Sequence, residues 1–225
     1  MSKFRWTSEN TSQLCASLLP FWVLSFIITF SRGRKKRTKI TDDAISNLVP
    51  GGDENRIFTE KLVISFWVYF VIAGILIMIA ATARCFSLEK LMKKLHMKFF
   101  VLRILNILFV VSAAFIMAMS FTPDTPAHDV SVAIGLTIMM ISQFMDAIIW
   151  SYIQNKGCSI DPNNYCGEIG YIFLLLFASI TMVGLIAAAT GYPTITQWIG
   201  VLSIFISFFV YGIQAFYIKK VLNKS

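Results

Sequence analysis

Long apolar runs separated by short polar segments dominate the chain from residue 14 onward. Six of these runs have the length of about 20 residues that an α-helix needs to cross the hydrocarbon core of a bilayer. They cover residues 14–31, 62–83, 99–121, 130–152, 169–190 and 197–218. The longest segment between them is 32–61, which leaves no room for a separate soluble domain. We therefore predict six membrane spans joined by short loops.

The apolar runs favour helices over the strands of a membrane barrel. Barrel strands are about ten residues long and alternate apolar with polar positions, whereas the stretch 75–81 is apolar at every position. The predicted fold class is all-α, a polytopic transmembrane helical bundle of six spans that forms one domain over residues 1–225. Pro20 lies inside the first span, where proline usually kinks a helix. Small residues in the spans should let helices approach closely, namely Gly74, Ala80, Ala81, Ala113, Ala114, Ala118, Gly184, Ala187, Ala188 and Ala189.

The composition agrees with a membrane protein and excludes other classes. Hydrophobic residues make up 56% of the chain and charged residues 14%, against about 25% charged residues in soluble domains. These values exclude a water-soluble enzyme, a disordered chain and a small disulfide scaffold. We expect the formal net charge of +8 to act on anionic lipid headgroups at cytoplasmic loops, and we expect no nucleic-acid partner.

The distribution of basic residues gives an orientation. Six spans place both termini on one side together with the second and fourth loops. That side carries twelve Lys and Arg residues, and the other side carries eight, all in the first loop. The positive-inside rule therefore favours cytoplasmic termini.

Two further features depend on this orientation. Cys158 and Cys166 share the fourth loop and could form a disulfide only if that loop were lumenal, because cytosolic thiols stay reduced. The glycosylation sequon that begins at Asn10 would matter only with a lumenal amino terminus.

The second loop combines apolar residues at helical spacing with lysines. Leu88, Leu91, Met92 and Leu95 recur every three or four residues, and Lys90, Lys93, Lys94 and Lys98 lie among them. This pattern predicts a short basic amphipathic helix on the cytoplasmic leaflet, with His96 on its solvated face. Each lysine near an anionic surface contributes about 1 kcal/mol to membrane binding. The expected partners are membrane lipids with anionic headgroups and a cytosolic protein.

Ionisable residues inside spans are costly and mark functional candidates. Arg103 and Asn106 are three residues apart in the third span, and Gln143 and Asp146 are three apart in the fourth. If these spans form an antiparallel hairpin, the four side chains meet at similar depth, near Gln214 of the sixth span. The cluster would then be a polar pocket that binds a headgroup or gates a path, or a buried ion pair that fixes helix register.

The sequence contains no complete catalytic motif and no Cys-x-x-Cys pair. We therefore expect no catalytic residues, no metal site and no cofactor, and a non-enzymatic role is favoured. His128 and Asp129 open the fourth span. Asp129 would cap the helix there, or His128 would titrate in an acidic lumen.

Several short motifs, in this order along nearly the whole chain, resemble the Frag/DRAM/Sfk family of six-span membrane proteins. They are Pro20, Ile-Thr-Asp at 40–42, Asp-Glu-Asn-Arg-Ile-Phe at 53–58, Arg103 with Asn106, His128-Asp129, Trp-Ser-Tyr at 150–152, and Cys158 with Cys166. Asp53 stands where the family usually has proline, Val130-Ser131 replaces a glycine pair, and the basic run 32–37 is unusual. The resemblance implies a lumenal motif of Asp42, Glu54, His128 and Asp129.

The resemblance also implies a function. Members of this family include the DNA-damage-regulated autophagy modulators, so the expectation is a lysosomal or other endomembrane regulator, with the plasma membrane as the alternative location. Other members assist a phosphatidylinositol 4-kinase or act in remodelling the lipid of GPI anchors. A lipid-handling protein is thus the second hypothesis, and a channel or transporter is the third. The sequence leaves the oligomeric state open.

Overall fold

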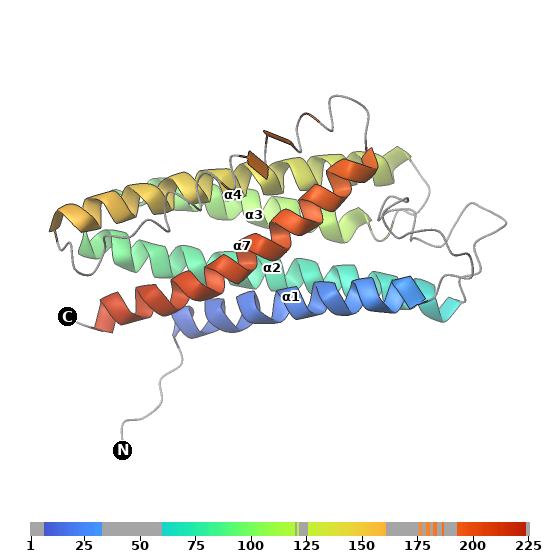
Figure 1. Ribbon diagram of the computed structural model, residues 1–225, viewed down its shortest axis with the longest axis horizontal. Coiled ribbons are helices and arrows are strands. Elements are labelled where there is room, and N and C mark those ends of the chain that lie inside the picture. Colours follow the sequence, from blue (N-terminus) through green and yellow to red (C-terminus); the bar gives the residue numbers. More distant parts are fainter. Residues whose placement is uncertain are drawn as a thin grey trace, which may run out of the picture.

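Five helices run along the length of one bundle in the computed structural model of the protein (Figure 1). They are α1 (Ser8–Arg32), α2 (Glu60–Lys94), α3 (Phe100–Met119), α4 (Pro126–Ile160) and α7 (Pro193–Asn223). The structure describes residues 7–32, 60–119, 121, 126–160 and 193–223, together with six single positions between 176 and 186. The class of this part of the chain is all-α.

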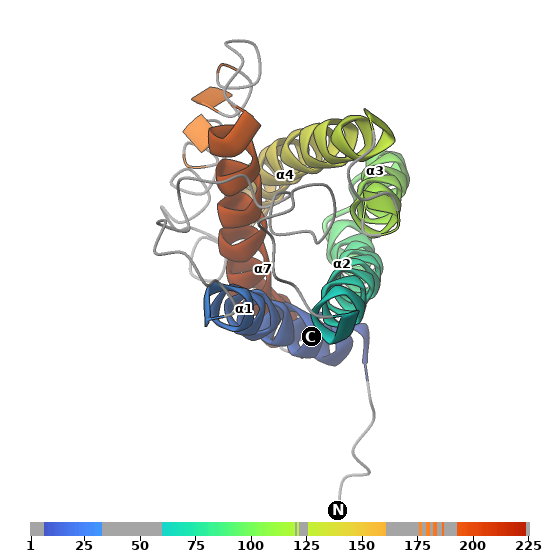
Figure 2. The ribbon, with the colours of Figure 1, turned by 90° about the vertical axis from the view of Figure 1, so that its right-hand side faces the viewer.

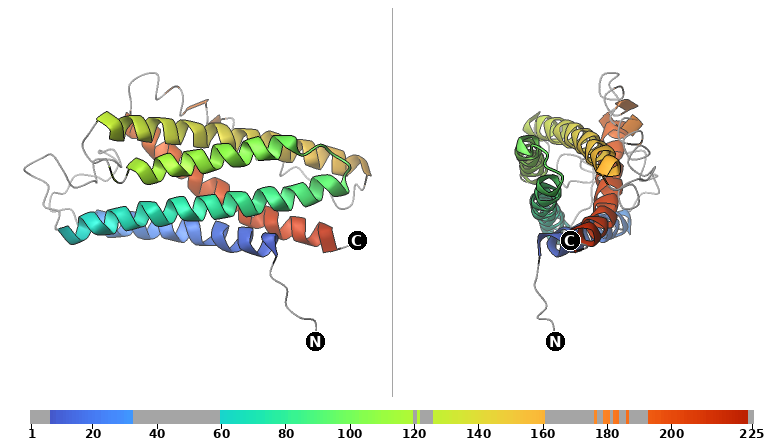
Figure 3. Two further views of the ribbon diagram at one scale, coloured as in Figure 1. Left: turned by 180° about the vertical axis from the view of Figure 1, so that it is seen from behind. Right: turned by 90° about the vertical axis from the view of Figure 1, so that its left-hand side faces the viewer.

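The helices are arranged as a ring when the bundle is viewed from one end (Figure 2). Each helix contacts the next in the order α1, α2, α3, α4 and α7, and α7 contacts α1 to close the ring. α7 also contacts α2, because it crosses the bundle obliquely from the α4 side to the α1 side (Figures 1 and 3). α1 begins, and α2, α4 and α7 end, at the same end of the bundle.

Four helices of the described chain are long and apolar enough to cross a membrane. They contain the stretches Trp67–Lys94, Phe100–Ala118, Val130–Cys158 and Ile199–Leu222. Six spans are therefore not shown. α1 covers the first predicted span with a helix of 25 residues, and the fifth predicted span, 169–190, lies mostly outside the described residues. The four candidate spans make the protein a multi-pass integral membrane protein.

Small residues allow close contact between α2, α3 and α4. Ala113 is fully buried, and its carbonyl oxygen would lie 3.2 Å from a Cβ atom placed on Gly74. A Cβ atom on Gly135 would lie 3.0 Å from the Cβ atom of Phe115. The prediction of close packing is confirmed for Gly74 and Ala113. It is wrong for Ala114, whose side chain is exposed on the outer face of α3.

The basic segment after the second predicted span is helical, but it is not a separate helix on the membrane surface. It forms the last turns of α2, which has 35 residues and is therefore about 52 Å long, well beyond the hydrocarbon thickness of about 30 Å. Its four apolar residues are buried in the core of the bundle, namely Leu88, Leu91, Met92 and Leu95. The interface prediction was wrong because these side chains are covered by neighbouring protein instead of by lipid.

α2 ends in a defined turn before α3. The amide of Met97 donates to the carbonyl of Met92, and the amide of His96 donates to that of Lys93. His96 has a φ of 54°, the left-handed conformation that this type of helix end requires. Met92 and Met97 are both buried. The turn therefore holds α2 and α3 as an antiparallel pair with His96 exposed at its tip.

Candidate functional site

A buried ion pair joins α2 to α4 inside the bundle. The guanidinium of Arg84 donates from Nε to Asp146 Oδ2 at 3.2 Å, and from Nη2 to Oδ1 at 3.2 Å and to Oδ2 at 3.0 Å. The side chains of Arg84 and Asp146 are 2% and 0% exposed. Both carboxylate oxygens are thus occupied by the same guanidinium, in the forked geometry that makes such pairs strong.

Aromatic rings from two helices cover the guanidinium of Arg84. Its central carbon lies 4.1 Å from the ring centre of Tyr211 on α7 and 5.8 Å from that of Trp150 on α4. A cation over an aromatic face is attracted by the ring quadrupole, and this attraction grows when water is excluded. The pair is therefore supported by α2, α4 and α7 together.

Several polar atoms near this pair have no hydrogen-bond partner among the described residues. Gln143 lies one turn before Asp146 and donates to Ser207 Oγ on α7 at 2.9 Å, but its Oε1 accepts no bond. Arg84 Nη1 and both amide atoms of Gln214 are likewise buried without a partner. Such atoms cost free energy in an apolar interior. The fold therefore keeps these polar groups in its interior at a cost in stability.

The structure separates the four residues that the sequence grouped into one cluster. Arg103 is exposed on α3, with its guanidinium 6.0 Å from the ring of Phe99. Asn106 accepts a hydrogen bond from Thr82 at 3.1 Å. Of the four, only Gln143 and Asp146 belong to the buried site, and the cation that faces Asp146 is Arg84.

The sequence does indicate that Arg84 belongs to the buried site, but the prediction missed it. The second span was predicted to end at residue 83, which placed Arg84 in the following loop. The pattern of small and apolar residues continues through Arg84 into Cys85, Leu88 and Leu91, which indicates one uninterrupted helix. An arginine on the buried face of such a helix needs an acidic partner.

A second group of polar side chains collects where α1 begins and α2, α4 and α7 end. Exposed or half-exposed basic residues from four helices and the α2–α3 turn lie at this end, namely Lys90, Lys93, Lys94, Lys98, Arg103, Lys156, Lys219 and Lys220. We call it the basic end. Its two acidic side chains in the described chain are paired, Glu9 with Lys90 at 3.0 Å and Glu89 with Lys93 at 2.6 Å. The basic end therefore presents an excess of positive charge.

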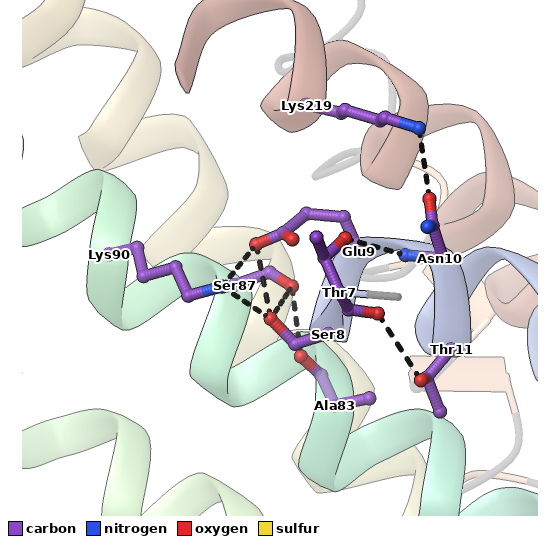
Figure 4. Close-up of polar contacts among 9 residues, drawn as sticks. All are labelled: Thr7, Ser8, Glu9, Asn10, Thr11, Ala83, Ser87, Lys90 and Lys219. Carbon is purple, nitrogen blue, oxygen red and sulfur yellow. Dashed lines mark hydrogen bonds and ion pairs between the residues drawn. The ribbon is translucent and has the colours of Figure 1, made fainter. Parts of the chain in front are cut away.

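Contacts between α1 and α2 tie the basic end together, as Figure 4 shows. Lys90 Nζ donates to Ser8 Oγ at 2.8 Å and to Glu9 Oε1 at 3.0 Å. Burial raises the pKa of the Glu9 carboxyl, but hydrogen bonds from Thr7, its own backbone and Lys90, together with the charge of Lys90, outweigh that effect and lower the pKa from 4.5 to about 2. Glu9 is therefore ionised at any physiological pH.

α7 joins the same network through one of its own lysines and one lysine of α2. Lys219 Nζ donates to Asn10 Oδ1 at 2.9 Å (Figure 4), and Lys94 Nζ donates to the carbonyl of Val221 at 2.9 Å. Asn10 is the acceptor of the predicted sequon. It lies half-buried in the first turn of α1, and Ser12 of the same sequon is buried. In the folded protein this sequon is therefore largely covered and tied to α7.

The remaining predicted site residues are placed only in part. Asp42 and Glu54 lie outside the described residues. His128 and Asp129 belong to the first turn of α4, which begins at Pro126 and not at residue 130, and their side chains lie outside the description. Cys158, at the end of α4, is disulfide-bonded, whereas Cys15 and Cys85 are free and buried.

The described residues include no group of three His, Cys, Asp or Glu side chains that could hold a metal ion. No protein-family model matches the chain, and no curated protein or solved structure matches it either. What the helices establish is therefore the class: a multi-helix integral membrane protein with four candidate spans, a buried ion pair and a basic end.

Proposed function

We propose that the protein is a non-enzymatic regulator in the membrane, of the DRAM type, whose basic end faces the cytoplasm and engages anionic lipid headgroups. The observation that carries the proposal is the excess of exposed cations at one end of the bundle. Lys93 and Lys90 are 58% and 49% exposed, while their acidic partners Glu89 and Glu9 are 25% and 5% exposed. Clustered lysines beside a span are typical of segments that bind anionic lipid.

The buried site supports a regulatory role over a catalytic one. Asp146 is fully buried and held by Arg84, whose guanidinium is covered by Tyr211, so its carboxylate is not presented to a substrate as a nucleophile or a general base. A buried, bonded pair fixes the relative position of α2 and α4. The bundle is then a rigid platform that presents the lysines of α2, α4 and α7 to one leaflet.

The compartment and process follow from the resemblance of the sequence to the DRAM group: a lysosomal or other endomembrane, and the promotion of autophagy. The proposal is tested in cells that lack the protein. Wild-type protein should localise with a lysosomal marker and restore autophagic flux. A variant with Lys93, Lys98 and Lys220 all changed to Gln should localise normally and restore at most half of that flux.

The matched control changes the same three lysines to Arg, which keeps the charge. It should restore flux as well as the wild type. Full restoration by the Gln variant would contradict the proposal. Loss of function in the Gln and Arg variants alike would indicate that these lysines bind a cytosolic protein through specific contacts, and would also contradict lipid binding as the role of the basic end.

A further inference from the structure

An open groove of about 580 Å³ runs between α1 and α7 on the outer face of the bundle. Gln13, Ser17, Pro20 and Phe21 form the α1 side, and Gly212 and Phe216 lie on the α7 side. The two helices lie side by side here: a Cβ atom on Gly212 would lie 3.8 Å from Ala16 Cβ and 3.8 Å from Ser17 Oγ, which is ordinary contact distance. Phe21 and Phe216 rise on either side and are 73% and 63% exposed.

The dimensions of the groove match one acyl chain in one leaflet. Its α1 side extends from Gln13 to Leu24, which is a rise of about 16 Å along a helix. Half of the hydrocarbon core of a bilayer is about 15 Å thick. The lining is apolar except near Gln13 and Ser17, which lie toward the basic end. The polar end of a bound lipid therefore belongs there.

Positive charge lies beyond that polar end of the groove. On α7, Ile213 and Phe216 line the groove, and Lys220 continues the same stripe one turn later, exposed. Lys219 is one turn beyond Phe216 and contacts Asn10 of α1. The mouth of the groove is therefore bordered by two ammonium groups and a carboxamide.

We propose that this groove holds an acyl chain of one anionic phospholipid, whose headgroup phosphate lies against Lys219 and Lys220. The charge at the mouth selects an anionic headgroup, and the concave apolar wall retains the chain more firmly than a flat helix surface would. This inference deepens the proposed engagement of anionic lipid and rests on it. It adds a specific site, a stoichiometry of one, and a role for α1 and α7.

The test counts lipid on purified protein. The protein is extracted in mild detergent from bilayers of neutral phosphatidylcholine with one tenth phosphatidylserine, and retained phospholipid is measured by native mass spectrometry. We expect about one phosphatidylserine per chain on the wild type. Ile213→Trp, which fills the groove from an exposed position, should lower the retained lipid at least fivefold. Lys220→Gln should abolish the preference for phosphatidylserine while phosphatidylcholine is still retained.

Two controls accompany these variants. Gly212→Ala places its methyl group in ordinary contact distance of α1 and should retain lipid. Lys220→Arg keeps the positive charge at the mouth of the groove and should leave the preference for phosphatidylserine unchanged. Wild-type protein without retained phospholipid, or Ile213→Trp protein that retains as much as the wild type, would overturn the proposal. So would equal effects of Lys220→Arg and Lys220→Gln.

The thermal midpoint of every variant is compared with that of the wild type, so that a variant that fails to fold is recognised. If Ile213→Trp fails to fold, Gly212→Leu replaces it, and the same loss of retained lipid is expected. Failure of the groove and failure of the proposed function are distinguishable. The lipid count is made on purified protein without reference to autophagy, whereas the complementation test does not depend on a retained lipid.

Discussion

Arg84 on α2 and Asp146 on α4 lie 62 positions apart in the sequence and form a bidentate pair that is sealed from solvent inside the bundle. Tyr211 of α7 covers the guanidinium at 4.1 Å, so residues of α2, α4 and α7 meet at the charge of Arg84. In an apolar environment each ion of such a pair carries a large desolvation cost, which only the other ion offsets. The two residues therefore depend on each other for their stability.

Asp146→Ala should destabilise the protein strongly, because it leaves Arg84 buried without its counter-charge. Breaking a buried pair costs about 3–5 kcal/mol. The double variant Arg84→Met/Asp146→Leu replaces the pair by apolar groups and should be more stable than Asp146→Ala. Thermal unfolding in detergent, followed by tryptophan fluorescence, measures both.

Arg103→Met is the matched control for this prediction, because Arg103 is an exposed arginine of the neighbouring helix α3. Its thermal midpoint should stay close to that of the wild type. If Asp146→Ala and Arg103→Met unfolded at the same temperature, the Arg84–Asp146 pair would have no stabilising role.

Two adjacent alanines of α3 should respond in opposite ways to enlargement. Ala113 is fully buried against α2, so Ala113→Leu overpacks the contact and should cost about 1–3 kcal/mol. Ala114 faces outward, and Ala114→Leu adds an apolar side chain to an apolar surface and should change the stability little. The thermal midpoints of the two variants in detergent test this prediction. A larger loss of stability for Ala114→Leu than for Ala113→Leu would mean that α3 is rotated relative to the structure.

The helical class and most helix positions could be predicted from the sequence, because a run of about 20 apolar residues has few alternatives in a membrane. Helix ends were harder to predict. α2 continues to Lys94 because Leu88 and Leu91 pack on the core of the bundle. The mean hydropathy falls at the lysines between these leucines, so the second span was predicted to end too early. The error follows from a helix that projects beyond the bilayer and is covered by protein.

The candidate site could be predicted only in part, for the same reason. Asp146 and Gln143 were recognised because polar residues inside a span are rare. Their partners depend on how the helices are rotated, and hydropathy does not report rotation. Arg103 was paired with Asp146 on grounds of depth alone, yet it faces outward and Arg84 takes that place.

The contact between Glu9 and Lys90 should make the stability depend on pH in the acid range. The pKa of Glu9 is lowered from 4.5 to about 2 in the folded protein. Its contribution is therefore complete above pH 4.5 and is lost as the pH falls toward 2. Because Lys90 is half-exposed, we expect this contribution to be at most about 1 kcal/mol.

Glu9→Gln should remove this contribution at neutral pH and flatten the loss of stability between pH 4.5 and pH 2. Thermal midpoints recorded across that range test the assignment. Lys93→Gln, which removes the pair with Glu89 within α2 and the contact of Lys93 with the ring of Phe99 but leaves Glu9 and Lys90 in place, serves as the comparison and should keep the wild-type slope. Identical slopes for the wild type and Glu9→Gln would show that another carboxylate governs the acid range.

The basic end and the disulfide of Cys158 lie at the same end of the bundle and indicate opposite compartments. Exposed lysines beside spans favour the cytoplasm, whereas disulfides persist in oxidising compartments. We give the basic residues more weight, because eight basic side chains from four helices and a turn contribute to the charge while the disulfide is observed at one described cysteine. A tag at the carboxyl terminus should therefore be stained after permeabilisation of the plasma membrane alone.

The disulfide of Cys158 has a test of its own. In protein that carries Cys15→Ser and Cys85→Ser, a membrane-permeant maleimide should label Cys158 only after reduction, because Cys158 is disulfide-bonded in the structure. A tag that stains only after all membranes are opened would place the basic end in the lumen. The lysines of α2 and α7 would then face away from the anionic cytoplasmic leaflet, and the proposed lipid contact would be excluded.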